Sequence, residues 1–79
     1  MTFEEAVESN LTIIVRDGEQ ALKLKRAFPK GKFMSVNARN PDGLRGIYVD
    51  ESIQFHPNFE RINKACHYWR VYFGEIPEI

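Results

Sequence analysis

A short apolar run near the N-terminus most constrains what this chain can fold into. Residues 11–15 read Leu-Thr-Ile-Ile-Val, and the Asp-Gly pair at positions 17 and 18 ends the run. Strands covered on one face alternate apolar and polar residues, whereas strands covered on both faces are almost continuously apolar. The run therefore predicts a strand that is buried on both faces, which is typical of parallel sheets.

The next segments indicate how this strand is connected. Asp17 is expected to cap a helix over residues 19–28, in which Ala21, Leu24 and Phe28 share one side. Residues 32–36 and 47–49 are the next apolar runs. Strand, helix and strand in this order imply a right-handed parallel crossover. We predict a single small α/β domain over residues 1–79, with three short, mainly parallel strands packed against two to three helices.

Helices are expected at both ends of the chain. Thr2 and Glu5 have the spacing of a capping box, and Asn10 suits the end of this first helix because asparagine tolerates a left-handed backbone. Residues 58–73 are predicted to form a terminal helix, and residues 75–79 a fraying tail. The helix prediction depends on apolar side chains at steps of three and four, namely Phe59, Ile62, Cys66, Trp69 and Phe73.

The composition excludes several classes of protein. The hydrophobic content is 43%, and no apolar run approaches the ~20 residues of a membrane-spanning helix, so we expect a folded chain without membrane partners. Lys and Arg total 11 and Asp and Glu total 11, so the basic surplus of non-specific nucleic-acid binders is missing. One cysteine and an acidic N-terminus without signal-peptide features favour the cytoplasm.

The segment from residue 40 to residue 51 is the most informative about function. Its apolar strand is followed directly by Asp50 and Glu51 and is preceded by a loop of Asn40, Pro41, Asp42, Gly43, Leu44, Arg45 and Gly46. This arrangement resembles the ATPase domain of phage large terminases, in which a loop of the form Ser/Asn-Pro-Asp-x-x-Arg-Gly precedes the Walker B strand and its Asp-Glu pair. The strand, helix and strand upstream are similar in outline.

The resemblance implies a role for each acid. Asp50 would hold the water shell of Mg²⁺, Glu51 would polarise the water that attacks the γ-phosphate, and Arg45 would belong to the loop before the strand. However, the triphosphate-holding sequence Gly-x-x-x-x-Gly-Lys-Ser/Thr occurs nowhere in the chain. Gly46 also abuts Ile47 directly, where the motors have a short spacer. We therefore expect no cofactor and no turnover of ATP.

Two other functions stay open on the sequence. The first is divalent-metal chemistry on phosphodiesters or nucleotides, with Mg²⁺ or Mn²⁺ held by Asp50 and Glu51 and with Asp17 as a third carboxylate. The second is a small nucleic-acid-binding module with weak, salt-sensitive affinity. Its contact residues would be the same as the candidate surface for a protein partner, namely Arg61, Lys64, Tyr68, Arg70 and Tyr72.

The preferred interpretation is a small, non-catalytic accessory or regulatory protein of phage or prophage type. Its fold would resemble an ATPase core that keeps the acidic strand end and has lost the nucleotide cradle. Unpaired strand edges on so small a sheet favour self-association or binding to another protein. We therefore expect the protein to act by protein–protein contact in the cytoplasm, which is the host cytoplasm if a phage encodes it.

Overall fold

The computed structural model confirms the α/β class and contains a fourth strand. It describes residues 1–38, 44, 46–65 and 70–78. Within these residues, four strands form one sheet in the order β2-β1-β3-β4, and all three neighbouring pairs are parallel. The elements in chain order are α1 (Phe3–Glu8), β1 (Thr12–Val15), α2 (Gly18–Ala27), β2 (Lys32–Ser35), β3 (Ile47–Asp50), the 3-10 helix η1 (Glu51–Ile53), α3 (Phe59–Ala65) and β4 (Val71–Gly74).

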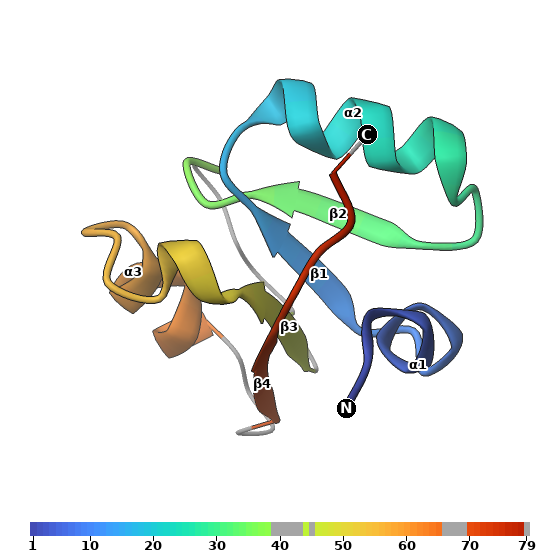
Figure 1. Cartoon of the computed structure of the whole chain (residues 1–79). Coiled ribbons are helices and arrows are strands. Elements are labelled where there is room, and N and C mark those ends of the chain that lie inside the picture. The colour runs from blue at the N-terminus through green and yellow to red at the C-terminus, as the bar shows by residue number, and fades with distance from the viewer. Residues whose placement is uncertain (39–43, 45, 66–69, 79) are drawn as a thin grey trace.

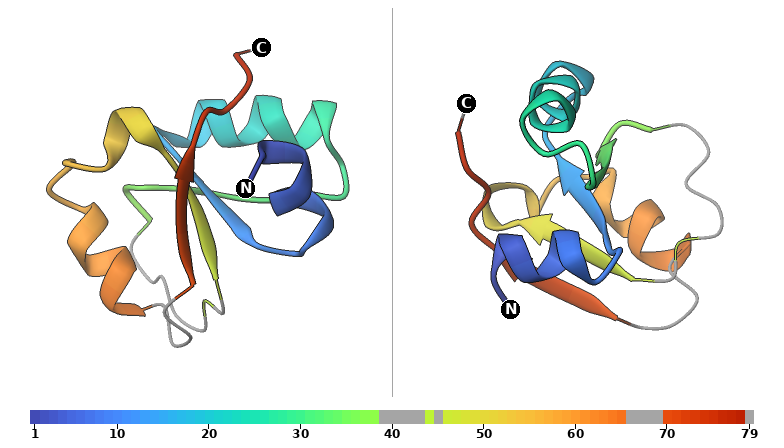
Figure 2. Two further views of the ribbon diagram at one scale, coloured as in Figure 1. Left: turned by 60° about the horizontal axis from the view of Figure 1, so that its bottom comes forward. Right: turned by 90° about the vertical axis from the view of Figure 1, so that its right-hand side faces the viewer.

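The sheet lies between two layers of helices. Helices α1 and α2 cover one face, and η1 and α3 cover the other (Figures 1 and 2). From β1 the chain crosses to β2 on one side, and from β3 it crosses to β4 on the opposite side. Right-handed crossovers in opposite directions place their helices on opposite faces, which explains the positions of α2 and α3.

Each face of the sheet has its own hydrophobic core. Ile13 and Val15 belong to the core under α1 and α2, and Ile14 belongs to the core under α3, because side chains alternate along a strand. All three are fully buried, which confirms the prediction for this strand. The first core also contains Phe3, Ala6, Leu11, Leu24, Tyr48 and Ile76, and the second contains Val36, Leu44, Ile47, Val49, Ile53 and Ile62.

The capping box predicted at the first helix is confirmed. The backbone N–H of Glu5 donates a hydrogen bond to Thr2 Oγ1 at 3.2 Å, and the N–H of Thr2 donates to Glu5 Oε1 at 3.3 Å. Asn10 has a φ of 60°, which is the left-handed conformation expected after α1. These local contacts fix the direction in which the chain enters β1.

The prediction of one helix over residues 58–73 is wrong. Helix α3 ends at Ala65, and Val71–Gly74 form β4, a parallel strand beside β3. Phe59 and Phe73 do meet, with ring centroids 5.6 Å apart, but one ring comes from a helix and the other from a strand. Of the other residues that support that prediction, Ile62 on α3 is buried in the second core, and Cys66 and Trp69 lie outside the described residues.

The first part of the tail after β4 is packed against the sheet, so the predicted fraying is wrong for residues 75 and 76. Ile76 is buried in the first core, and the tail crosses toward α2 (Figure 1). The Tyr48 hydroxyl donates a hydrogen bond to the Glu75 carbonyl at 3.0 Å. A Cβ at Gly74 would overlap the Tyr48 hydroxyl. Glycine at this position therefore lets the tail close over Tyr48.

We expect Gly74→Ala to lower the free energy of unfolding by about 1–3 kcal/mol, because the added methyl group overlaps the Tyr48 side chain. Gly18→Ala is the matched control, since open space surrounds that position at the start of α2. It should leave stability unchanged or raise it by about 0.4–1 kcal/mol. Urea unfolding followed by circular dichroism measures both variants, and similar losses in the two would contradict this account.

Stability should also fall as the pH rises above about 10, the ordinary pKa of tyrosine. Burial raises the pKa of Tyr48 in the folded chain, and the carboxylates of Glu51 and Glu4 raise it further. Above the unfolded pKa the unfolded state then binds fewer protons than the folded state, so the free energy of unfolding decreases. Tyr48→Phe should remove this part of the decrease and cost about 0.5–1.5 kcal/mol at neutral pH, through the lost hydrogen bond to Glu75.

Urea unfolding of both proteins, measured from about pH 8 to about pH 11, provides the comparison. Lysines titrate in both proteins over this range, so only the difference between the two curves reports on Tyr48. Curves that run parallel across the whole range would show that the tyrosine has no such role.

Candidate functional site

The carboxyl ends of the parallel strands β1, β3 and β4 lie at the same end of the sheet. The chain crosses from β1 to β2 in one direction and from β3 to β4 in the other, so the sheet has its switch point between the neighbouring strands β1 and β3. In open α/β sheets, ligands bind outside the carboxyl ends of the strands at such a switch point. Two hollows here share lining residues and form one carboxyl-end groove, whose polar lining is Arg16, Asp17, Glu19, Gln20, Lys23, Asp50, Glu51, Ser52, Glu75 and Glu78.

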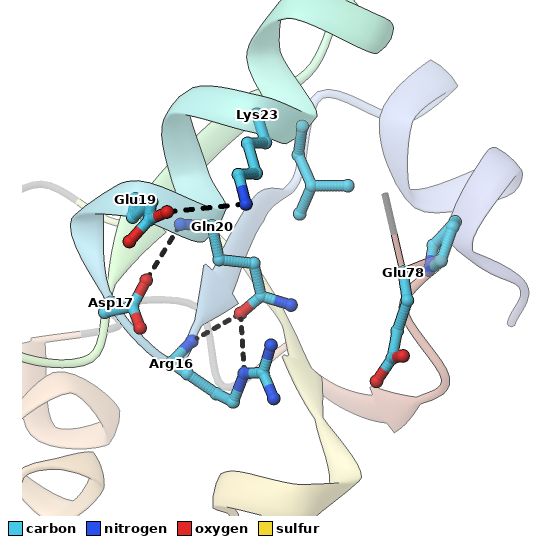
Figure 3. A pocket seen from close by; sticks show the side chains of 8 residues that line it. Arg16, Asp17, Glu19, Gln20, Lys23 and Glu78 are labelled. Atoms are coloured by element: carbon cyan, nitrogen blue, oxygen red, sulfur yellow. Dashed lines mark hydrogen bonds and ion pairs between the residues drawn. The ribbon is translucent and has the colours of Figure 1, made fainter.

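At the start of α2, backbone N–H groups donate hydrogen bonds to side chains of the same segment (Figure 3). Only residues 16 and 17 connect β1 to α2. Asp17 is the predicted cap, and its carboxylate accepts a hydrogen bond from the Gln20 N–H at 2.8 Å. Gln20 Oε1 in turn accepts from the Arg16 backbone N–H at 2.9 Å and from Arg16 Nε at 3.3 Å. Phosphate-binding loops instead direct several backbone N–H groups at their ligand.

Asp50 makes a similar local contact. Its carboxylate accepts a hydrogen bond from the Ser52 N–H at 3.0 Å and thereby caps η1. Glu51 is exposed at the first position of η1. Among the described residues, no group of three or more His, Cys, Asp or Glu side chains could hold a metal ion. Asp50 and Glu51, with Asp17 as the third carboxylate, thus do not form a recognisable cation site in this part of the chain.

The carboxyl-end groove carries an excess of negative charge. Its cations are Arg16 and Lys23, and Lys23 pairs with Glu19 at 3.4 Å while both side chains are largely exposed. Glu78 lies across the hollow from Arg16 (Figure 3). A phosphate group entering the groove would meet carboxylates that outnumber the cations, namely Asp17, Glu19, Asp50, Glu51, Glu75 and Glu78. The charge of the groove therefore disfavours a phosphorylated ligand.

Two residues of the terminase-like loop are described, and both have packing roles. Leu44 is buried in the second core. Gly46 immediately precedes β3, where a Cβ would lie 2.6 Å from the Leu11 side chain and 3.2 Å from Arg70 Cβ. The Gly46 carbonyl also accepts a hydrogen bond from the Thr12 N–H at 3.1 Å. The remaining loop residues lie outside the described ones, namely Asn40, Pro41, Asp42, Gly43 and Arg45.

The residues predicted to form an interaction surface do not share one helix. Arg70 precedes β4 and Tyr72 lies within it. Tyr72 packs against the first core, on the face of the sheet opposite to α3. Tyr68 lies outside the described residues. The row of cations and aromatic rings expected from a continuous helix is therefore absent among the described members.

The two members on α3 make separate contacts. Arg61 Nη2 donates a hydrogen bond to the Ala38 carbonyl at 2.7 Å, which links α3 to the segment after β2. Lys64 pairs with Glu60 at 3.4 Å, and both side chains are about three-quarters exposed at 76%. Arg61 thus has a structural contact, whereas the exposed pair contributes little to stability.

Comparison with protein family models, with curated proteins and with solved structures finds no match for this chain. Within the described ranges, no helix has the length and apolar character needed to span a bilayer. The assignment of function therefore rests on the fold and on the groove, and the resemblance to terminase motors stays a prediction.

Several groove residues were not singled out from the sequence. Arg16 follows β1 directly, and Gln20 lies in the first turn of α2. The sequence could have indicated both, because polar residues between a parallel strand and the first turn of the next helix lie at the carboxyl end of the sheet. Glu75 and Glu78 enter the groove only because β4 carries the chain back along β3. The sequence carries no separate signal for these two, because the helical spacing over residues 58–73 hides the strand that brings them to the groove.

We expect Asp17→Ala to lower the free energy of unfolding by about 0.5–2 kcal/mol, because it removes the acceptor for the Gln20 N–H at the start of α2. Asp17→Asn is the control, since asparagine caps helices about as well and keeps the acceptor while removing the charge. Urea unfolding compares the two. A loss in Asp17→Asn as large as that in Asp17→Ala would assign the effect to charge rather than to capping.

Proposed function

We propose that this chain is a small, non-catalytic accessory or regulatory protein, of phage or prophage type, that acts by binding another protein. The observation that carries the proposal is the two-residue connection between β1 and α2, whose polar groups bond to one another through Asp17, Gln20 and Arg16. A terminase-type motor needs its triphosphate-holding loop between a strand and a helix of this kind. The connection here leaves no room for one.

The acidic end of β3 supports the same proposal. The Asp50 carboxylate is engaged by the Ser52 N–H at 3.0 Å, and the groove around it is predominantly acidic. Hydrolysis of a phosphoanhydride needs a metal ion and an oriented water beside the phosphate. An acidic groove without a recognisable cation site among the described residues favours a role for these acids in structure rather than in turnover.

Binding to a protein is supported by apolar side chains that the fold leaves in solvent. Phe55, on the segment between η1 and α3, is 90% exposed, and Leu22 on α2 is 54% exposed. Leu22 and Phe33 line a largely apolar hollow beside the edge strand β2. Single exposed apolar residues are common, but an almost fully exposed phenylalanine, together with sheet edges that no described strand pairs with, is typical of proteins that bind partners.

The test sets nucleotide and metal chemistry against protein binding. Mg²⁺, Mn²⁺ and MgATP are titrated into the full chain while NMR follows the amide signals of residues 48–52. We expect no saturable shifts and no ATP hydrolysis above background. Asp50→Asn is the control variant, because asparagine keeps an acceptor for the Ser52 N–H. Saturable shifts in the wild-type chain that Asp50→Asn abolishes would overturn the proposal in favour of chemistry at Asp50 and Glu51.

Partner binding has its own readout. Cross-linking in the native host, at the concentration present there, should convert the chain into adducts with a different protein. Recovery of the monomer alone would count against the proposal. Binding to DNA or RNA that weakens steeply with salt and is lost in Arg61→Ala or Arg70→Ala would favour the nucleic-acid module instead.

A further inference from the structure

The outer edge of β4 has hydrogen-bonding groups whose directions follow from its pairing with β3. Ile47 pairs with Val71 and Val49 pairs with Phe73, and the Ile47 N–H donates to the Arg70 carbonyl at 2.8 Å. In a parallel ladder, a residue bonds to the two residues that flank its partner, so residues 70, 72 and 74 direct their backbone groups toward β3. The N–H and C=O groups of Val71 and Phe73 consequently point outward, away from the sheet.

These outward-pointing groups can pair with the same groups of a second copy of β4 when the two strands run antiparallel. A two-fold axis at Tyr72 would place Val71 of one copy opposite Phe73 of the other. Both residues direct their backbone groups outward, so each of these pairs would be a hydrogen-bonded pair that exchanges both of its N–H···O=C bonds. The two four-stranded sheets would then continue into one another across the axis.

The side chains of β4 fit the same arrangement. Val71 and Phe73 alternate with Tyr72 and lie on the face of the sheet that α3 covers, where Val71 packs against the second core. Phe73 stays 42% exposed although its ring meets Phe59. Opposite residues on one face of an antiparallel pair have Cβ atoms about 4.5–5.5 Å apart. Val71 of a second copy would therefore cover the exposed part of Phe73.

Charges at the two ends of β4 select the antiparallel direction. Arg70 precedes the strand, Glu75 follows it, and the strand itself, Val-Tyr-Phe-Gly, carries no charge. Antiparallel pairing brings the start of one strand beside the end of the other, so Arg70 of each copy comes near Glu75 of the second copy. Parallel pairing would bring like charges together. The formal net charge of +0 adds no general repulsion between copies.

The edge of the sheet at β2 is protected by lysines, unlike the edge at β4. Strand β2 begins at Lys32, which is exposed. Lys25 Nζ donates hydrogen bonds to the carbonyls of Pro29 and Gly31, at 2.7 and 2.8 Å, just before the strand. Lysine is a residue with which edge strands commonly prevent the addition of a further strand. Among the described residues, β4 is therefore the edge that lacks such protection.

We propose that the outer edge of β4 binds β4 of a second copy of this chain, antiparallel, with the two-fold axis at Tyr72. Stable complexes bury about 1,200–2,000 Å² in total, and a four-residue strand supplies only part of that area, so the dimer dissociates on dilution in the micromolar range. The inference goes beyond the proposed function, because it names the chain's own copy and its register and requires no other protein.

Disulfide cross-linking tests the register in a chain whose one cysteine, Cys66, is replaced by serine. Tyr72→Cys places the thiols on the axis, where the Cα atoms of a non-hydrogen-bonded pair are about 4.5 Å apart and a disulfide forms readily. Phe73→Cys is the matched control, since the two copies of that residue lie diagonally, about 8–9 Å apart. We expect about tenfold more covalent dimer from Tyr72→Cys than from Phe73→Cys. Equal yields would overturn the proposed register.

The wild-type chain provides a test that does not depend on how the variants fold. Sedimentation equilibrium from about 1 μM to about 1 mM should show the mass rising from 9.2 kDa toward twice that value. Amide hydrogen exchange at Val71 and Phe73 should slow as the concentration increases, while exchange at Phe33 and Ser35 on the β2 edge should not change. A chain that stays monomeric, or protection that appears at β2 instead, would overturn the proposal and leave binding to a different protein unaffected.

Discussion

The rest of the structure depends on the burial of β1 on both faces. Ile13, Ile14 and Val15 are fully buried, so the chain must supply apolar cover on each side of a sheet whose central strand offers no polar face. Burying one such side chain stabilises the fold by roughly 1.5–3 kcal/mol. A chain of 79 residues has little material for two cores, which explains why both its first helix and its last residues take part in covering the sheet.

The segments predicted well from the sequence are those in which local signals agree with one another. The run from Leu11 to Val15 suits only a strand, and the helix that follows begins at a capping residue and has an apolar stripe. The segment that becomes β4 is different, because Phe73 continues the helical spacing that starts at Phe59. Val-Tyr-Phe also suits a strand, and only the unpaired edge of β3 decides between the two.

The candidate site shows why a short acidic motif does not determine chemistry. Aspartate and glutamate after a strand suit a metal ion, but they equally suit the start of a 3-10 helix, where Asp50 accepts the Ser52 N–H. The sequence contains the acids in either case. Whether the acids bind a metal ion or cap a helix depends on the neighbouring strand and the turn that follows it. Here the backbone N–H groups of the turn after β1 donate to the side chains of Asp17 and Gln20.

For the partner binding proposed above, these constraints favour the sides of the sheet over the carboxyl ends of its strands. An α/β protein that binds a small ligand leaves backbone donors unsatisfied at the switch point and protects its lateral edges. This chain has the reverse arrangement, since Gln20 accepts the Arg16 backbone N–H at the carboxyl end and the acidic tail lines the groove there, while β4 itself carries no charge. Because β4 also brings Ile76 into the first core and Glu75 to Tyr48, the strand that offers this edge is held in place by the core itself. Such an edge is ordered before a partner arrives, so binding there carries little cost in conformational entropy.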